Sequence, residues 1–117
     1  MKSFFDTGIT IDVIEGNCPE VDTTDVCMLD TNLAELYYWY LRNHNKKTAD
    51  YFYKRFSEVS VPIPQDLIPE AMQFRFENKR LNFSYQDALG YIYARRNGLC
   101  FITSDKAFKG LKGVKIL

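Results

Sequence analysis

The chain has 117 residues, of which 46% are apolar and 26% are charged. This composition is that of a globular protein and excludes a disordered chain, and the length predicts a single domain over residues 1–117. The longest apolar stretch, residues 33–41, is much shorter than the roughly 20 residues of a membrane span, and Asp6 interrupts the apolar run that a secretory signal requires. We therefore expect no association with a membrane.

The cysteines and the charge distribution bear on compartment and partner. Cys18, Cys27 and Cys100 cannot all pair within the chain and show no Cys-x-x-Cys spacing. We expect free thiols in a reducing compartment, and hence the cytoplasm. The formal net charge is zero, but residues 1–35 hold eight acidic residues and a single basic one. The remaining bases lie in residues 36–117, so a local basic surface and a nucleic-acid partner are not excluded.

Short apolar runs alternate with segments of helical periodicity. In chain order we first expect a strand at residues 3–6, a helical segment ending at residues 16–17 and a strand at 25–29. Helices follow at 32–42 and 46–57, then a strand at 59–63 and helices at 66–79 and 84–97. The chain continues with a strand at 99–103, a turn of helix at 106–110 and a strand at 114–117. Pro62 favours a sheet edge for the third strand. The alternation predicts an α/β fold, with a mostly parallel sheet covered by helices on both faces.

Four acidic residues stand at the boundaries of these elements. Asp6 ends the first strand and Asp105 follows the fourth, whereas Glu35 and Asp87 lie in the expected first turns of two helices. Parallel sheets form their sites beyond the carboxyl ends of the strands, near the point where the strand order reverses. If the first and fourth strands are neighbours, the four carboxylates converge at one end of the sheet.

Each acid also has a purely structural interpretation. The patterns Asn-x-x-Glu at 32–35 and Ser-x-x-Asp at 84–87 fit capping boxes, Asp105 fits a helix N-cap, and Asp6 fits a turn. Capping does not explain why the acids gather, and crowded carboxylates repel one another unless a cation lies among them. Mg²⁺ and Mn²⁺ prefer oxygen ligands and share substrate phosphates, so the cluster predicts metal-assisted hydrolysis of a phosphodiester.

Two other families share part of this pattern. Asp-Thr-Gly at residues 6–8 matches the signature of aspartic proteases, but that fold is almost wholly β, and the segments after residue 30 have helical periodicity. A phospho-receiver domain requires an Asp after its third strand and a Lys after its fifth. Here the third strand runs into Ile-Pro-Gln at 63–65 and the chain stops at the fifth. We therefore favour neither family.

Four motifs in order resemble the PIN domain family, as in VapC-type toxins, over nearly the whole chain. They are FDTGI at residues 5–9 with EGN at 15–17, NLAELYY at 32–38, LNFSYQDALGY at 81–91 and FITSDKAF at 101–108. The resemblance implies a three-layer sandwich around a five-stranded parallel sheet in the order 3-2-1-4-5. It also implies a Mg²⁺- or Mn²⁺-dependent endoribonuclease acting on single-stranded RNA, frequent homodimers and, for toxins, a partner antitoxin.

The resemblance also assigns site residues. It places the catalytic and metal-binding carboxylates at Asp6, Glu35, Asp87 and Asp105. It makes Thr7, Thr103 and Ser104 the hydroxyl residues that support them. Gly8 stands where many members have Asn or Ser, so a hydrogen bond near the site is expected to be missing.

Basic and aromatic residues supply candidate binding surfaces. Beside the fourth motif, candidate RNA contacts are Arg95, Arg96, Lys106 and Lys109, and a second basic track precedes the third motif at residues 75–80. Both have an alternative as ordinary solvated faces. The aromatic residues of 37–40 and 51–56 are expected to pack two helices together, with some left for a dimer or antitoxin surface. His44 is expected in a solvated loop.

Two other functions remain open at this stage. One is a non-catalytic PIN-like module that binds RNA or a protein, and it predicts binding without cleavage. The other is a purely structural dimer subunit, and it predicts no affinity for metal. Retention of all four acids favours the nuclease over both.

Overall fold

A computed structural model describes residues 2–18 and 21–117 of the chain. It contains one sheet, in which every paired strand is parallel to its neighbour, in the order β3-β2-β1-β4-β5. The strands are β1 (Ser3–Phe5), β2 (Val26–Leu29), β3 (Ser60–Val61), β4 (Cys100–Thr103) and β5 (Val114–Ile116). The predicted sheet and its strand order are confirmed. Because β1 pairs with both β2 and β4, the strand order reverses beside β1, where such sheets form their sites.

The helices follow the predicted segments closely. They are α1 (Thr7–Ile14), α2 (Asp30–Asn43), α3 (Lys46–Ser57), α4 (Leu67–Glu77) and α5 (Tyr85–Arg96), with 3₁₀ turns η1 (Lys79–Leu81) and η2 (Lys106–Phe108). Within residues 2–18 and 21–117, no helix combines the length and apolar character needed to cross a membrane.

The start of α2 corrects one prediction. The helix begins at Asp30, two residues before the expected start, so Asn32 is inside its first turn. The side-chain Oδ1 of Asn32 accepts a hydrogen bond from the backbone N–H of Leu29 at 3.0 Å, which satisfies a free donor at the helix start. The predicted capping box at 32–35 is therefore wrong, and Glu35 lies in the second turn of α2.

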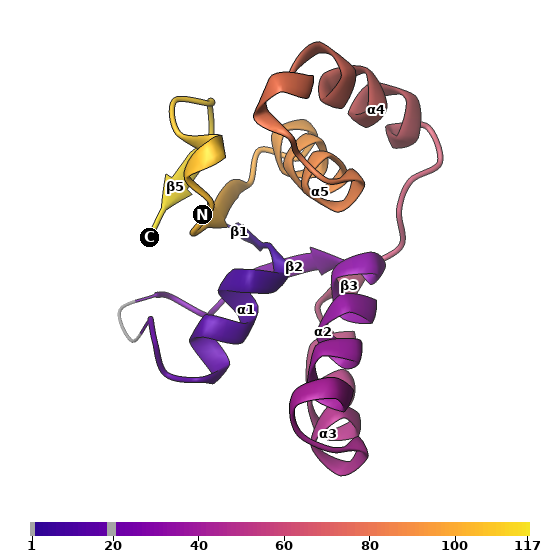
Figure 1. The fold of residues 1–117 in the computed structure, drawn as a ribbon, viewed down its shortest axis with the longest axis vertical. Coiled ribbons are helices and arrows are strands. Elements are labelled where there is room, and N and C mark those ends of the chain that lie inside the picture. The colour runs from indigo at the N-terminus through magenta and orange to yellow at the C-terminus, as the bar shows by residue number, and fades with distance from the viewer. Residues whose placement is uncertain (1, 19–20) are drawn as a thin grey trace.

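Helices cover both faces of the sheet. Successive side chains of a strand point to opposite faces, and Phe4 and Phe5 of β1 are both buried. Phe4 packs in the core beneath α4 and α5, whereas Phe5 packs against Ile9 of α1 on the other side. Figure 1 shows α4 and α5 together on one side of the sheet, while α2 and α3 lie side by side and extend away from it. The three-layer arrangement is thus as predicted.

Aromatic rings form the centre of the main core. The ring centroids of Phe4 and Phe101 are 5.6 Å apart, and Phe108 lies 4.8 Å from Phe101 and 4.3 Å from Phe83. All of these rings are at most 2% exposed. Burial of each contributes about 1.5–3 kcal/mol to stability. The stack joins the sheet to the residues just before α5, and so fixes where α5 begins.

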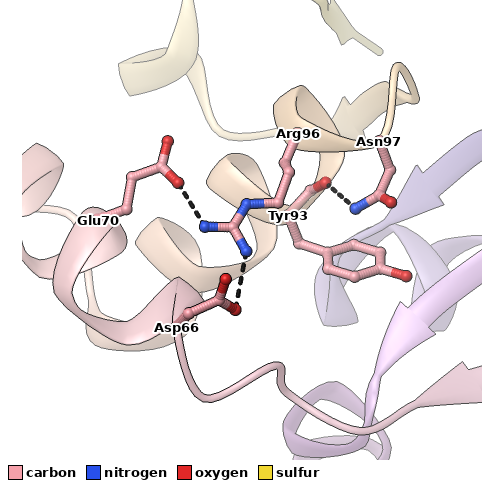
Figure 2. A network of polar contacts seen from close by, with 5 residues as sticks. All are labelled: Asp66, Glu70, Tyr93, Arg96 and Asn97. Atoms are coloured by element: carbon pink, nitrogen blue, oxygen red, sulfur yellow. Dashed lines mark hydrogen bonds and ion pairs between the residues drawn. The ribbon is translucent and has the colours of Figure 1, made fainter.

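Polar contacts tie α4 to the far end of α5 (Figure 2). The guanidinium of Arg96 donates to Asp66 Oδ1 at 3.0 Å and to Glu70 Oε1 at 2.8 Å. The side chain of Asn97 donates to the Tyr93 carbonyl at 2.8 Å and so closes the end of α5. These contacts orient the two helices, although an exposed ion pair adds only about 1 kcal/mol or less.

The α2–α3 pair has a small core of its own, as the aromatic pattern predicts. Leu36, Tyr40 and Ala49 are buried between the helices. At its surface, the Tyr37 hydroxyl donates to Asp50 at 2.6 Å.

Candidate active site

Asp6 is held at the junction between the sheet and α1. It is the N-cap of α1, and its Oδ1 accepts from the backbone N–H of Ile9 at 2.8 Å. Its Oδ2 accepts from the hydroxyl of Thr103, at the end of β4, at 2.6 Å. Thr103 is fully buried, so this contact locks the carboxylate between the ends of two neighbouring strands. The expected turn at residues 6–8 is instead the first turn of a helix.

Glu35 is joined to α1 through hydroxyl and amide groups. The hydroxyl of Thr7 donates to Glu35 Oε1 at 2.8 Å, and accepts from the side-chain amide of Asn32 at 3.2 Å. Sequence reasoning missed this role of Asn32. A signal was available, because Asn32 stands one helical turn before Leu36, on the face that is buried in the core.

Asp87 is placed by the predicted capping box of α5, which is confirmed. The hydroxyl of Ser84 accepts from the Asp87 N–H, and Asp87 Oδ2 accepts from the Ser84 N–H, both at 3.0 Å. The capping bond of Asp87 uses its Oδ2, so the capping role does not require Oδ1. The structural and the functional interpretations of Asp87 are therefore compatible.

Three of the predicted acids line one cavity of about 130 Å³. Its lining includes Asp6, Thr7, Gly8, Asn32, Glu35, Ser84, Gln86 and Asp87, with Phe4 and Phe101. Among the described residues, its lining includes no basic side chain. The cavity is thus an acidic pocket at the carboxyl end of the sheet, assembled from segments far apart in the sequence.

The electrostatics of the pocket follow from burial and mutual repulsion. Burial raises the pKa of Asp6, and the charges of Asp87 and Asp105 add to this, against the hydrogen bonds from Thr103 and Ile9. The pKa of Glu35 is also raised, chiefly because its carboxylate loses hydration at the pocket, although the residue as a whole is exposed. The hydrogen bond from Thr7 lowers this pKa, and the charge of Asp87 raises it further. The pocket therefore favours the uptake of a proton or a cation.

Asp105 lies beside the pocket, where its charge reaches Asp6. Its Oδ1 accepts from the Ala107 N–H at 2.9 Å, which confirms its expected role as an N-cap. Its own backbone N–H donates to the Thr103 hydroxyl at 3.0 Å, so this hydroxyl links Asp6 to Asp105. Ser104, the third predicted supporting residue, is exposed.

The donors of the pocket fit one kind of metal ion. Within the described part of the chain, no three His, Cys, Asp or Glu residues are close enough to hold a metal as they stand. The donors are oxygens, however, and the pKa of Asp6 is raised chiefly by burial and further by the charges of Asp87 and Asp105, both of which a bound cation would offset. Mg²⁺ keeps several of its waters and binds proteins through one or two carboxylates. The pocket fits such a hydrated ion better than a metal caged by protein ligands alone.

The predicted RNA contacts divide into two groups. Lys106 and Lys109 are exposed on and just after η2, close in sequence to Asp105. Arg95 and Arg96 lie in the last turn of α5, about 13 Å along the helix from Asp87 at ~1.5 Å per residue. The structure does not bring them to the pocket, and Arg96 is already bonded to α4 (Figure 2).

Two further residues differ from or extend the sequence prediction. His44 is exposed in the connection between α2 and α3, as expected, and its Nε2 lies 3.4 Å from Glu15 Oε1, a neighbour that the sequence did not predict. Gln86 lines the pocket, and its side-chain nitrogen is buried without a hydrogen-bond partner among the described residues. The sequence held a weak signal for Gln86, since it directly precedes Asp87.

Comparison with solved structures shows the fold. A chain of a toxin–antitoxin complex from Klebsiella pneumoniae matches with a TM-score of 0.78 and 22% identity, over 97% of this chain and 96% of that one. VapC20 of Mycobacterium tuberculosis, described as a sarcin–ricin loop cleaving toxin, matches with a TM-score of 0.75 and 19% identity, over 98% of both chains. VapBC2 from Rickettsia felis, bound to promoter DNA, matches with a TM-score of 0.73 and 16% identity, over 100% of this chain and 98% of that one.

This chain has the PIN-domain fold. The fold implied by the sequence resemblance is therefore confirmed. No protein-family model and no curated protein matches the sequence.

Proposed function

We propose that this protein is a Mg²⁺- or Mn²⁺-dependent endoribonuclease that cleaves RNA phosphodiester bonds with a metal-activated water. The observation that carries this proposal is the pocket in which Asp6, Glu35 and Asp87 meet at the carboxyl end of the sheet. The fold supports it, since one structure with the same fold is described as a toxin that cleaves the sarcin–ricin loop.

In this proposal the acidic residues would bind the cation, and neighbouring groups orient their carboxylates. Asp6, Asp87 and Asp105 would hold the cation, directly or through its waters, with Glu35 as a further ligand or as the group that orients its water. When bound, the cation supplies Lewis acidity and lowers the pKa of its water. Thr103 and the Ile9 N–H each hold one oxygen of Asp6, so the carboxylate cannot rotate away. Thr7 orients Glu35 in the same way.

We further propose that the protein is a toxin that acts in the cytoplasm, forms a homodimer and is neutralised by a small antitoxin. One structure with the same fold is part of a toxin–antitoxin complex. A surface suited to a protein partner lies on α2 and α3. There a shallow groove is lined by Ala34, Tyr37, Tyr38, Leu41, Asp50 and Tyr53. Sedimentation of the purified chain tests the dimer, which predicts twice the monomer mass.

Cleavage of a pool of structured RNAs tests the nuclease. It is run with Mg²⁺, with Mn²⁺ and with EDTA, on the wild type and on Asp6→Asn and Asp87→Asn. We expect metal-dependent cuts that fall by roughly 100-fold or more in both variants, because each removes a charged ligand. Asp66→Asn is the matched control, since that carboxylate is 81% exposed and lies on α4 away from the pocket.

The same samples distinguish the alternatives. Cuts that persist in EDTA or in both pocket variants would overturn the proposal. RNA binding without cleavage would indicate a non-catalytic binding module. Absence of both cleavage and Mn²⁺ binding by calorimetry would indicate a structural subunit. Thr103→Val and Thr7→Val should each lower activity by about 10- to 100-fold, as expected of groups that orient metal ligands.

A further inference from the structure

An exposed tyrosine begins the helix whose first turn contributes to the lining of the acidic pocket. Tyr85 is the first residue of α5, and its neighbours Ser84 and Gln86 both line the pocket. Its own side chain is 63% exposed. Burial in the core therefore does not explain this ring, which lies two residues before Asp87 in the same turn of α5.

The ring of Tyr85 is held by an arginine of α4. The Arg75 guanidinium lies over it, with Cζ 4.2 Å from the ring centroid. The Nε of Arg75 also donates to the Phe83 carbonyl at 2.8 Å, which fixes the guanidinium in place. Figure 1 shows α4 and α5, which carry these two side chains, packed beside one another. The pair is a supported aromatic surface rather than a freely moving side chain.

A second aromatic–cation pair lies on the same segment. Phe76 is 69% exposed, and the Lys79 ammonium is 5.0 Å from its ring centroid. Residues 75–85 contain three basic residues, Arg75, Lys79 and Arg80, and one acidic residue, Glu77. The segment that leads to the pocket is therefore basic as well as aromatic.

The charge of this segment indicates which partner it fits. Exposed rings beside fixed cations form the usual surface for single-stranded nucleic acids. The nucleobases stack on the aromatic rings, and the basic side chains neutralise the phosphates. The groove on α2 and α3 differs, because the charged residue in its lining is Asp50, which is already paired with Lys46, and no basic residue is among the described residues that line it. A paired duplex does not present the face of its bases, so the strand must be unpaired.

We propose that Tyr85 stacks on an unpaired RNA base next to the phosphate that enters the acidic pocket. Arg75 holds the ring, and Lys79 and Arg80 contact the flanking phosphates. The position of the cut rests on the proposed ribonuclease function. The stacking contact itself does not, because it is measured by binding alone.

The first test is equilibrium binding of a short fluorescent single-stranded RNA to the full chain, in EDTA so that nothing is cleaved. Tyr85→Ala should weaken binding by about 5- to 150-fold, the usual range for loss of one base–aromatic stack. Tyr85→Phe keeps the ring and should bind as the wild type does. Tyr51→Ala is the matched control, since that tyrosine is 61% exposed on α3 and should not affect binding.

A second probe separates stacking from charge. An abasic chain of the same length keeps the phosphates but has no bases, so Tyr85→Ala should not weaken its binding. Lys79→Ala should weaken the binding of both probes and lower the slope of log affinity against log salt by about 0.7, as expected for one lost phosphate contact on a single strand.

Each outcome bears on one proposal. If Tyr85→Ala binds the RNA as tightly as the wild type, or loses affinity equally for the abasic chain, the stacking proposal is overturned and the nuclease proposal stands. It is also overturned if the wild type does not bind single-stranded RNA. If Tyr85→Ala changes the sedimentation mass, the ring packs against another copy and does not serve RNA. If the wild type binds but never cleaves, while Tyr85→Ala loses binding, the stacking contact stands and the nuclease proposal fails.

Discussion

The α4–α5 and α2–α3 helix pairs bury their apolar faces against different parts of the molecule. The α4–α5 pair lies on the sheet and shares one core with rings such as Phe4 and Phe101. The α2–α3 pair, which extends away from the sheet in Figure 1, has a core of its own. It packs largely on itself around Leu36, Tyr40 and Ala49 and leaves several rings exposed at its surface. A pair packed on the sheet belongs to the cooperative unit, whereas a pair packed on itself tolerates local change and keeps surface for a partner.

This difference matters for the pocket. Asp87 lies in the first turn of α5, the helix that packs on the aromatic core, and Glu35 lies in the second turn of α2. The far end of the α2–α3 pair carries none of the predicted acids. We therefore expect changes beneath α5 to disturb stability and activity together, and changes at the far end of α2–α3 to disturb neither strongly.

Truncating one buried ring in each region gives the largest expected contrast. Phe101→Ala removes a fully buried ring that packs on Phe4, Tyr91 and Phe108, and should lower the free energy of unfolding by about 3–5 kcal/mol. Phe52 is only half-buried, so Phe52→Ala should cost about 2 kcal/mol or less. Urea unfolding followed by circular dichroism measures both. Equal losses would show that the two regions are equally coupled to the core.

A glycine beneath α5 sharpens the contrast. A Cβ at Gly90 would lie 2.8 Å from Cε1 of the buried Phe4 ring, so Gly90→Ala should destabilise the protein by about 1–3 kcal/mol. At Gly8 a Cβ would meet Asp6 Oδ1 at an ordinary 3.7 Å. Gly8→Ala should therefore stabilise α1 by about 0.5–1 kcal/mol. Thermal unfolding compares the two, and a tolerated alanine at position 90 would show that the core beneath α5 yields easily.

Removing the hydroxyl of one buried tyrosine in each region compares how much its hydrogen bonding contributes to stability. The Tyr91 hydroxyl donates to the Lys112 carbonyl at 2.8 Å, so Tyr91→Phe should cost about 0.5–1.5 kcal/mol. The Tyr40 hydroxyl is buried with no hydrogen-bond partner in the described residues. Removing it in Tyr40→Phe should raise stability by about 1 kcal/mol, because an unsatisfied buried group is lost. A loss of stability in Tyr40→Phe would indicate that solvent satisfies this hydroxyl.

The last contrast is a dependence on alkaline pH. Burial raises the pKa of Tyr40 from 10 to about 12. The unfolded chain loses this proton first, so the stabilisation is complete below pH 10 and disappears as the pH rises from 10 to 12. The pKa of Tyr91 and Tyr93 is raised as well, and the comparison is therefore made between wild type and Tyr40→Phe. The wild type should lose more stability than the variant over that range, and identical pH profiles would contradict the burial of Tyr40.

Local features of the sequence determined the elements and the positions of the acids. Strands, helices and the capping box at 84–87 depend on periodicity and on groups a few residues apart, so they could be predicted without knowing the fold. The start of α2 was predicted wrongly, because Asn32 fits a cap in sequence. In the structure its amide instead reaches Leu29 and, 25 residues away, Thr7.

The assembly of the pocket was decided only by the tertiary structure. The bond between Asp6 and Thr103 spans 97 residues, and it exists because β1 and β4 are parallel neighbours. The same packing engages Arg96 with α4 and leaves Asp105 beside the pocket. Sequence alone determines which groups each element carries. Which of those groups meet depends on how the elements pack, because only packing brings distant segments within hydrogen-bonding distance.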